Sequence, residues 1–232
     1  MEMKTIGLLG GMSWESTLQY YRMINQGVKN ALGGLHSARI VLYSLDFDPL
    51  EKMLSSGNWE ELAQELSHAA MRVESAGADF LLICTNTMHQ VASDIEDSLE
   101  IPVLHIADAT AETLVIDGIE RVGLLGTTLT MEHDFYKQRL QEEYDIEVVI
   151  PDLEERRIVH EVIFQELCLG KIKDSSKQSY LRIMDRLADK GAQGIILGCT
   201  EIGMLVQQKD TEIKLYDTTA IHAEKAIDYA LT

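Results

Sequence analysis

The chain has 232 residues, of which 46% are hydrophobic and 25% charged, and its formal net charge is −18. The length fits one large domain or two small ones with a substantial core, and the acidic surface disfavours nucleic acid and anionic membranes as partners. No apolar run approaches the length that spans a bilayer, and the N-terminus has no signal-peptide pattern, so we expect a cytoplasmic protein without membrane contact.

Apolar runs that predict buried strands alternate along the chain with segments of helical periodicity. The predicted strands are Thr5–Leu9, Ile40–Leu45, Phe80–Cys84, Val103–Ile106, Arg121–Leu125, Glu147–Ile150, Gly194–Leu197 and Ile213–Tyr216. The predicted helices include Glu60–Ser75, Glu132–Glu143, Ser176–Lys190 and Thr218–Leu231. This alternation predicts an α/β fold with mainly parallel sheets that are flanked by helices.

An internal repeat divides the chain into two similar halves. Residues 77–87 read GADFLLICTNT and residues 191–201 read GAQGIILGCTE, while IGLLG at residues 6–10 matches VGLLG at residues 122–126. We therefore expect a first α/β lobe of residues 1–109 plus 215–232 and a second α/β lobe of residues 110–214. Aligning the two longer phrases places Thr85 on Cys199.

Small, hydroxyl-rich segments follow four of the predicted strands: GGMSWEST, CTNTMH, GTTLT and GCTE. Ligands of parallel α/β sheets bind beyond the carboxyl ends of the strands. If matched strand ends face one another across a cleft, Thr85 and Cys199 lie on opposite sides of one bound molecule. Two proton-handling groups on opposite faces of one carbon are what a racemase needs.

Cys199 is the stronger candidate for acid–base chemistry. It is predicted to lie where a buried strand opens into a helix, and a helix N-terminus stabilises a thiolate. The neighbouring Glu201 can tune the thiol or accept its proton. The alternatives are a small apolar side chain at a sheet end and an acidic residue that favours the first helical turn.

Thr85 stands where the repeat would place a second cysteine. Its hydroxyl is too weak an acid to serve as a base at rest, so it can only relay a proton or cap a helix. His89 follows one helical turn later and could exchange a proton with Thr85. Strand alternation points the adjacent Cys84 to the other face, into the core.

Further polar residues at the predicted strand ends can bind a carboxylate through hydroxyl, amide or backbone N–H groups, with helix capping as the alternative. These candidates are Met12, Ser13, Asn86, Thr87, Thr127, Thr128, Thr200 and Glu201. Lys171 is a candidate for pairing with a side-chain carboxylate. No CxxC, clustered His/Cys, P-loop or GxGxxG pattern occurs, so we expect neither a metal nor a cofactor.

The segments IGLLGGMSWEST, GGLHSAR, CTNTMH and GCTE together resemble the aspartate/glutamate racemase family, and closely its amino-acid racemase branch. The resemblance covers essentially the whole chain. It implies two α/β lobes related by a pseudo-twofold axis, a homodimer, and an isomerase that acts on acidic amino acids without pyridoxal phosphate, nucleotide or metal.

In that family two cysteines at the lobe interface act as acid and base. The second cysteine corresponds to Cys199, and the first corresponds to Thr85, where this chain departs from the pattern. The resemblance therefore implies that L substrates react faster than D substrates. The alternatives are a hydantoin racemase, a maleate isomerase or related decarboxylase, and a non-catalytic module that binds carboxylates or amino acids.

Overall fold

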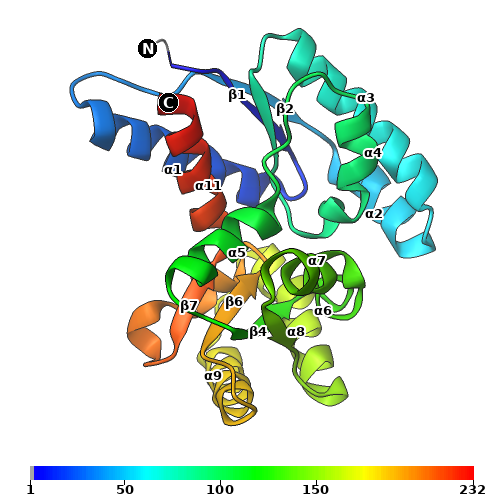
Figure 1. Cartoon of the computed structure of the whole chain (residues 1–232). Helices are drawn as coiled ribbons and strands as arrows, with labels where there is room; N and C mark the ends of the chain where they lie inside the picture. The colour runs from blue at the N-terminus through cyan, green and yellow to red at the C-terminus, as the bar shows by residue number, and fades with distance from the viewer. Residues whose placement is uncertain (1–2) are drawn as a thin grey trace. The chain divides into compact units, whose positions relative to one another are not determined.

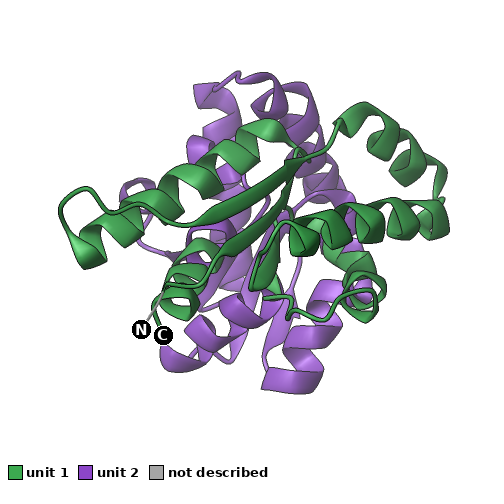
Figure 2. Cartoon of the chain, turned by 90° about the horizontal axis from the view of Figure 1, so that it is seen from above, with its two compact units in different colours: residues 1–106, 222–232 green, residues 107–221 purple. Residues whose placement is uncertain are grey.

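The structure is a computed structural model that describes residues 3–232. The chain forms two compact units, residues 1–106 with 222–232 and residues 107–221, which are coloured separately in Figure 2. The internal repeat predicts these divisions at residues 109/110 and 214/215. The second boundary lies inside the last helix, α11 (Thr218–Leu231), because the strand that precedes this helix pairs within unit 2.

Unit 1 contains a three-stranded parallel sheet in the order β2-β1-β3. Its strands are β1 (Ile6–Gly10), β2 (Ile40–Ser44) and β3 (Phe80–Ile83). Its helices are α1 (Trp14–Leu32), α2 (Phe47–Ser56), α3 (Trp59–Ser75), the 3₁₀ helix η1 (Thr87–Val91), α4 (Ala92–Asp97) and most of α11.

Alternation along the strands of unit 1 produces two apolar layers. Leu9, Leu81 and Ile83 pack toward α3, whereas Leu8 and Leu82 pack with residues of α1 and α11 on the other face. Figure 1 shows α1 and α11 side by side on one face of this sheet. Because side chains of successive strand residues point to opposite faces, both layers are filled by the same short apolar strands.

Unit 2 contains a four-stranded parallel sheet in the order β5-β4-β6-β7. Its strands are β4 (Arg121–Gly126), β5 (Glu147–Val149), β6 (Gly194–Gly198) and β7 (Lys214–Asp217). The helical elements are α5 (Ile106–Ile116), α6 (Thr128–Glu132), α7 (Asp134–Tyr144), α8 (Leu153–Gln165), η2 (Leu167–Leu169), α9 (Asp174–Asp189), α10 (Ile202–Leu205) and η3 (Gln208–Asp210). The predicted α/β class with two helix-flanked parallel sheets is confirmed.

The predicted strand Val103–Ile106 is wrong. Only Val103 forms an isolated bridge, to Leu81, and Ile106 already begins α5. The preceding Pro102 has no N–H to donate, although its carbonyl accepts a hydrogen bond from the Leu81 amide at 2.9 Å. The ladder therefore does not extend before Val103. Beyond Leu104 it ends because the Ile106 amide donates to His89 Nε2 and not to the backbone of β3.

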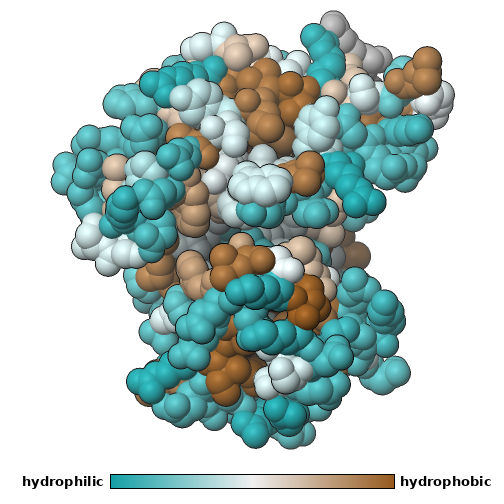
Figure 3. All heavy atoms as spheres, turned by 180° about the vertical axis from the view of Figure 1, so that it is seen from behind, coloured by the Kyte–Doolittle hydropathy of each residue, from teal (hydrophilic) through white to brown (hydrophobic). Residues whose placement is uncertain are grey.

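On the face drawn in Figure 3, teal hydrophilic side chains surround smaller brown apolar patches. Within residues 3–232, no helix combines the length and apolar character needed to cross a bilayer.

Candidate active-site residues at the strand ends

The loop after β1 in unit 1 carries Met12 and Ser13. Met12 is buried, and Ser13 is the N-cap of α1, where its hydroxyl accepts a hydrogen bond from the Ser16 amide at 3.2 Å. The Ser16 hydroxyl donates to the Cys84 carbonyl at 3.3 Å. This bond holds the first loop beside the turn that follows β3, so the structure brings two predicted site segments together within unit 1.

Gly11 makes the sharp entry into this loop possible. Its φ is +91°, and a Cβ at this position would overlap the backbone of Leu45. The Gly11 amide donates to the Thr17 hydroxyl at 2.8 Å, and that hydroxyl donates to the Ser13 carbonyl at 2.9 Å. A residue with a side chain at position 11 would have to move either Leu45 or the loop.

The turn after β3 carries Cys84, Thr85, Asn86 and Thr87. Cys84 is fully buried among core residues of α1 and α11, and burial raises the pKa of its thiol. Thr85 remains partly exposed, whereas Asn86 and Thr87 are buried. The 3₁₀ helix η1 begins after Asn86 and has no side-chain cap, so capping is not the role of Thr85.

Both ring nitrogens of His89 are bonded to backbone groups of unit 1. Nδ1 lies 2.8 Å from the Thr85 carbonyl oxygen, and Nε2 lies 3.2 Å from the Ile106 amide nitrogen. The proton exchange between His89 and the Thr85 hydroxyl that the sequence suggested is therefore not supported. His89 contacts the backbone of Thr85 instead.

In unit 2, the end of β6 places a thiol beside a buried carboxylate. Cys199 Sγ donates to Glu201 Oε2 at 2.9 Å, and the Thr200 hydroxyl donates to the same oxygen at 2.7 Å. Glu201 is 6% exposed. A buried carboxylate with two donors is held in place where it can accept a proton from the thiol.

The expectation that a helix N-terminus stabilises a Cys199 thiolate is wrong. The helix α10 begins only at Ile202 and has four residues. Although Cys199 keeps some exposure to solvent, burial raises the pKa of its thiol well above the ordinary value, and the Glu201 carboxylate raises it further. At rest the sulfur therefore carries its proton.

The end of β4 lies beside the end of β6, since Gly126 and Gly198 are paired in the sheet. A Cβ on Gly198 would lie 3.0 Å from the Leu125 carbonyl oxygen, which shows how closely the two strand ends approach. Thr127 follows β4 as the N-cap of α6, and the Thr128 amide donates to His160 Nδ1 at 3.2 Å. Unit 2 therefore brings Thr127, Thr128, Cys199, Thr200 and Glu201 to one edge of its sheet.

The contact between His160 and the Thr128 amide is not predicted by the sequence. Burial lowers the pKa of His160, which favours the neutral ring that can accept this hydrogen bond. Nothing in the sequence pattern pointed to this contact, because the two residues lie on different helical segments, α6 and α8.

Lys171 lies in the loop between η2 and α9, with an exposed side chain. Its amide donates to the Glu166 carbonyl at 2.9 Å, which closes the turn. The 3₁₀ helix η2 packs against α10, and the Cys168 thiol on η2 contributes to the raised pKa of Cys199. The loop that carries Lys171 therefore follows η2 directly, and η2 packs against α10, the helix that begins three residues after Cys199.

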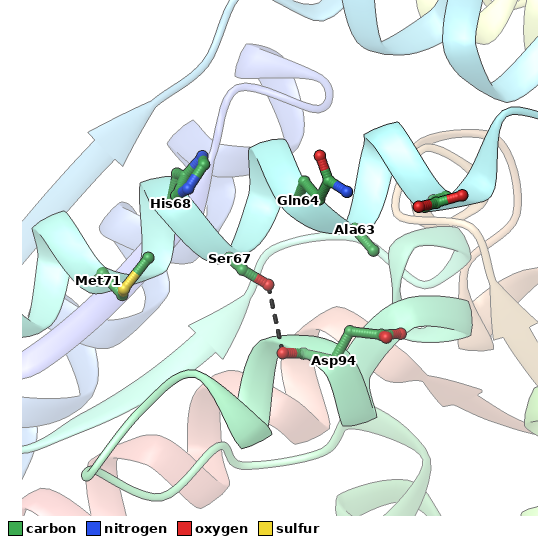
Figure 4. A pocket seen from close by; sticks show the side chains of 7 residues that line it. Ala63, Gln64, Ser67, His68, Met71 and Asp94 are labelled. Carbon is green, nitrogen blue, oxygen red and sulfur yellow. Dashed lines mark hydrogen bonds between the residues drawn. The ribbon is translucent and has the colours of Figure 1, made fainter.

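None of the predicted site residues lines the pocket shown in Figure 4. This pocket, of about 320 Å³, lies between α3 and α4 and is lined by Glu60, Ala63, Gln64, Ser67, His68, Met71 and Asp94. Ser67 points to Asp94 and donates to its carbonyl at 3.3 Å. Over residues 3–232, no three His, Cys, Asp or Glu side chains form a group that could hold a metal ion.

Comparison with known proteins identifies the family. The model of the Asp/Glu/hydantoin racemase family matches residues 9–226. The chain belongs to this family. The matched range includes the end of β1, all of β2 to β7 and every predicted site residue. The protein is therefore an isomerase of the racemase type.

Relatives of this racemase-family chain include proteins from several bacteria and an archaeon. It is 23% identical to the broad specificity amino-acid racemase RacX of Bacillus subtilis (strain 168), over 96% of each chain. A Yersinia pestis protein assigned to the Asp/Glu racemases is 54% identical, with a TM-score of 0.94 over 99% of this chain and 100% of that one. An aspartate racemase homologue from Pyrococcus horikoshii OT3 is 35% identical, with a TM-score of 0.87 over the same shares.

A more distant structure shares the fold alone. The glutamate racemase of Francisella tularensis, solved in complex with D-glutamate, is 16% identical, with a TM-score of 0.70. The match covers the whole of this chain and 82% of that one. The racemase fold is thus retained even where most residues differ.

Proposed function

We propose that this racemase-family protein interconverts the enantiomers of aspartate, glutamate or both by proton transfer at Cα, without a cofactor. The observation that carries the proposal is the hydrogen bond from the Cys199 thiol to the buried Glu201 carboxylate. The relatives support the substrate class, since their names include amino-acid, aspartate and Asp/Glu racemases.

Cys199 and Glu201 act together in the first step. Glu201 accepts the thiol proton as the Cys199 sulfur takes the Cα proton of the L substrate, which leaves a carbanion at Cα and a neutral thiol. This pairing is consistent with the raised pKa of Cys199, because a thiol that is protonated at rest needs a base to activate it. The Thr200 hydroxyl holds the same carboxylate oxygen in position.

The developing carbanion needs stabilisation, because the α-proton of an amino acid is very weakly acidic. Preorganised N–H and O–H donors on the α-carboxylate supply it. We assign this role to the segments Met12–Ser13, Asn86–Thr87 and Thr127–Thr128, together with Thr200. We assign to Lys171, an exposed cation, the recognition of the side-chain carboxylate of the substrate.

Thr85 takes the position of the second acid–base group, as the internal repeat predicts. Its hydroxyl returns a proton to Cα with the help of water, since it is too weak an acid to do so efficiently by itself. We therefore propose that L substrates exchange their α-proton readily, whereas inversion to the D form is slow.

Deuterium exchange at Cα tests this proposal. L- and D-aspartate and L- and D-glutamate are incubated with the protein in D₂O, and exchange and inversion are followed separately by NMR and chiral chromatography. We expect exchange of the L enantiomers that is abolished in Cys199→Ala. Binding of these acids without exchange of any of them would instead favour a non-catalytic module.

A related superfamily activity is the other candidate. Hydantoins and maleate are incubated with the same preparation. Turnover of either one, without exchange at aspartate or glutamate, would favour the related activity over the proposed one.

The family resemblance also leads us to propose a homodimer that acts in cytoplasmic D-amino acid metabolism. Sedimentation equilibrium measures the mass, which would be twice 26.0 kDa for a dimer.

A further inference from the structure

The buried ring of His89 joins two backbone segments of unit 1. Nδ1 lies 2.8 Å from the Thr85 carbonyl oxygen, and Nε2 lies 3.2 Å from the Ile106 amide nitrogen. A carbonyl oxygen only accepts a hydrogen bond, and a backbone amide only donates one. The ring must therefore be neutral, with its proton on Nδ1.

A second buried histidine holds the same segment from another helix. His222, on α11, has Nε2 2.7 Å from the Leu104 carbonyl oxygen and Nδ1 2.9 Å from the Tyr20 hydroxyl. Its single proton must lie on Nε2, because the Leu104 carbonyl can only accept. The Tyr20 hydroxyl then donates to Nδ1.

The two rings thus hold both ends of residues 104–106, the segment that leads into α5. His222 bonds the Leu104 carbonyl, and His89 bonds the Ile106 amide. His105, between these residues, packs edge-on against the His89 ring with centroids 4.5 Å apart. The His89 and His222 rings are 6.0 Å apart. Each ring must carry its proton on one particular nitrogen to make both of its hydrogen bonds. Rotation of either ring by 180° would therefore break these bonds.

We infer that His89 is a positioning residue, which fixes the Thr85 turn to the start of α5 through the two nitrogens of a neutral ring. His222 and Tyr20 hold the other end of the same segment. This inference rests on the proposed function, which gives Thr85 its place in proton transfer. His89 acts through the Thr85 backbone and exchanges no proton with the substrate.

The arrangement requires uncharged rings. A second proton on His89 would set an N–H group against the Ile106 N–H and break that bond. The titratable groups that face His222 are Tyr20 and His89, and His105 adds a further ring beside His89. Burial, with a smaller effect of His89, lowers the pKa of His222 to about 3, which keeps His222 neutral.

Two substitutions separate the two bonds of His89. The side-chain amide of asparagine can donate from a position close to Nδ1, and that of glutamine can accept at a position close to Nε2. His89→Asn therefore keeps the bond to Thr85 and loses the one to Ile106, and His89→Gln does the reverse. His68→Asn and His68→Gln, at an exposed position on α3, are the matched controls.

The measured quantity is the ratio of inversion to Cα exchange for L-aspartate in D₂O, in the parent and in a Thr85→Cys background. Each His89 variant cuts the link between the Thr85 turn and the start of α5, at one nitrogen or at the other. A displaced catalytic group loses rate steeply, so we expect His89→Gln and His89→Asn each to lower this ratio about tenfold or more. Both His68 variants should leave the ratio nearly unchanged. An equal loss of exchange and inversion in both His89 variants would overturn the inference, because it would indicate a general structural role.

A second measurement does not depend on activity. Nitrogen-15 NMR of the imidazole rings at pH 7 should show His89 protonated at Nδ1 and His222 protonated at Nε2. The Ile106 amide should exchange with solvent faster in His89→Asn than in His89→Gln. If the parent catalyses no exchange, the proposed function fails while these results still support the positioning of Thr85. A proton on His89 Nε2 at neutral pH would overturn it.

Discussion

The Cys199 thiol and the Glu201 carboxylate are joined by a hydrogen bond of 2.9 Å at the end of β6. Burial raises the pKa of this thiol well above the ordinary value, and the Glu201 carboxylate raises it further. The same residue therefore suppresses the free thiolate at rest and is placed to receive the thiol proton during the reaction. These two effects can be separated by substitution.

Glu201→Gln should have opposite effects on thiol reactivity and on catalysis. The amide oxygen can still accept a hydrogen bond, but it cannot take the thiol proton, so Cα exchange of L-aspartate should fall by about 10²–10⁴-fold. Loss of the negative charge should lower the pKa of Cys199, so alkylation of the thiol by iodoacetamide at pH 8 should become faster. Retained exchange in this variant would remove Glu201 from the mechanism.

Thr85→Cys should increase inversion while leaving L-substrate exchange nearly unchanged. A thiol is a far better proton donor than a hydroxyl near neutral pH, and we expect a gain of about 10²-fold or more in the rate of racemisation. Chiral chromatography of L-aspartate after timed incubation measures it. Thr85→Val, which removes the hydroxyl at constant shape, is the control and should reduce inversion further.

Stability should decline in mild acid because of His222. The pKa of this ring is lowered to about 3 in the folded protein by burial, whereas the ordinary histidine pKa is about 6.5. Between these values the unfolded chain binds a proton that the folded chain does not. The contribution of this neutral ring is therefore complete above pH 6.5 and is lost as the pH falls from 6.5 toward 3.

The slope of this loss is about 1.4 kcal/mol per pH unit, or about 2 kcal/mol between pH 6.5 and pH 5. Urea denaturation at several pH values measures it. His222→Gln, which can still donate to the Leu104 carbonyl, should show a correspondingly smaller slope. An identical slope in the parent and in His222→Gln would assign the acid sensitivity to other groups, and His68→Gln controls for the loss of a histidine as such.

Gly11→Ala should destabilise the protein more than Gly57→Ala. Both glycines have positive φ, +91° and +72°, and replacing either costs about 1–2 kcal/mol for the left-handed backbone. A Cβ at Gly57 meets nothing within 4 Å, whereas one at Gly11 overlaps the Leu45 backbone. We expect an additional cost of about 1–3 kcal/mol from that overlap, measured by denaturant titration. Equal costs would mean that the loop moves freely.

Much of the fold could be predicted from periodicity and from the internal repeat. The strands around Ile6, Ile40, Phe80, Arg121 and Gly194 were predicted to within one residue at each end. The segment after Pro102 is predicted wrongly, because this short apolar run forms a single bridge and then enters α5, where the Ile106 amide donates to His89. Whether such a run pairs as a strand depends on its tertiary contacts, which the local sequence pattern does not determine.

The candidate site was predictable as a set of strand ends, but its electrostatics were not. The repeat aligned Thr85 with Cys199, yet the sequence suggested a thiolate at a helix N-terminus, where the structure has a protonated thiol bonded to Glu201. The length of α10 decided this outcome. Likewise the partner of His89 Nε2 is the Ile106 amide, and only the tertiary structure brings these two residues together.

The boundary of the two units inside α11 bears on the order in which the protein is made. Ala223, Ala226 and Ala230 complete the apolar layer that contains Ile6, Leu8 and Phe80, although they lie more than a hundred residues beyond these strands. Unit 2 is one continuous stretch of chain, so a ribosome delivers all of it before it delivers the closing helix of unit 1. The half of the protein that is synthesised first is thus the half whose core is finished last.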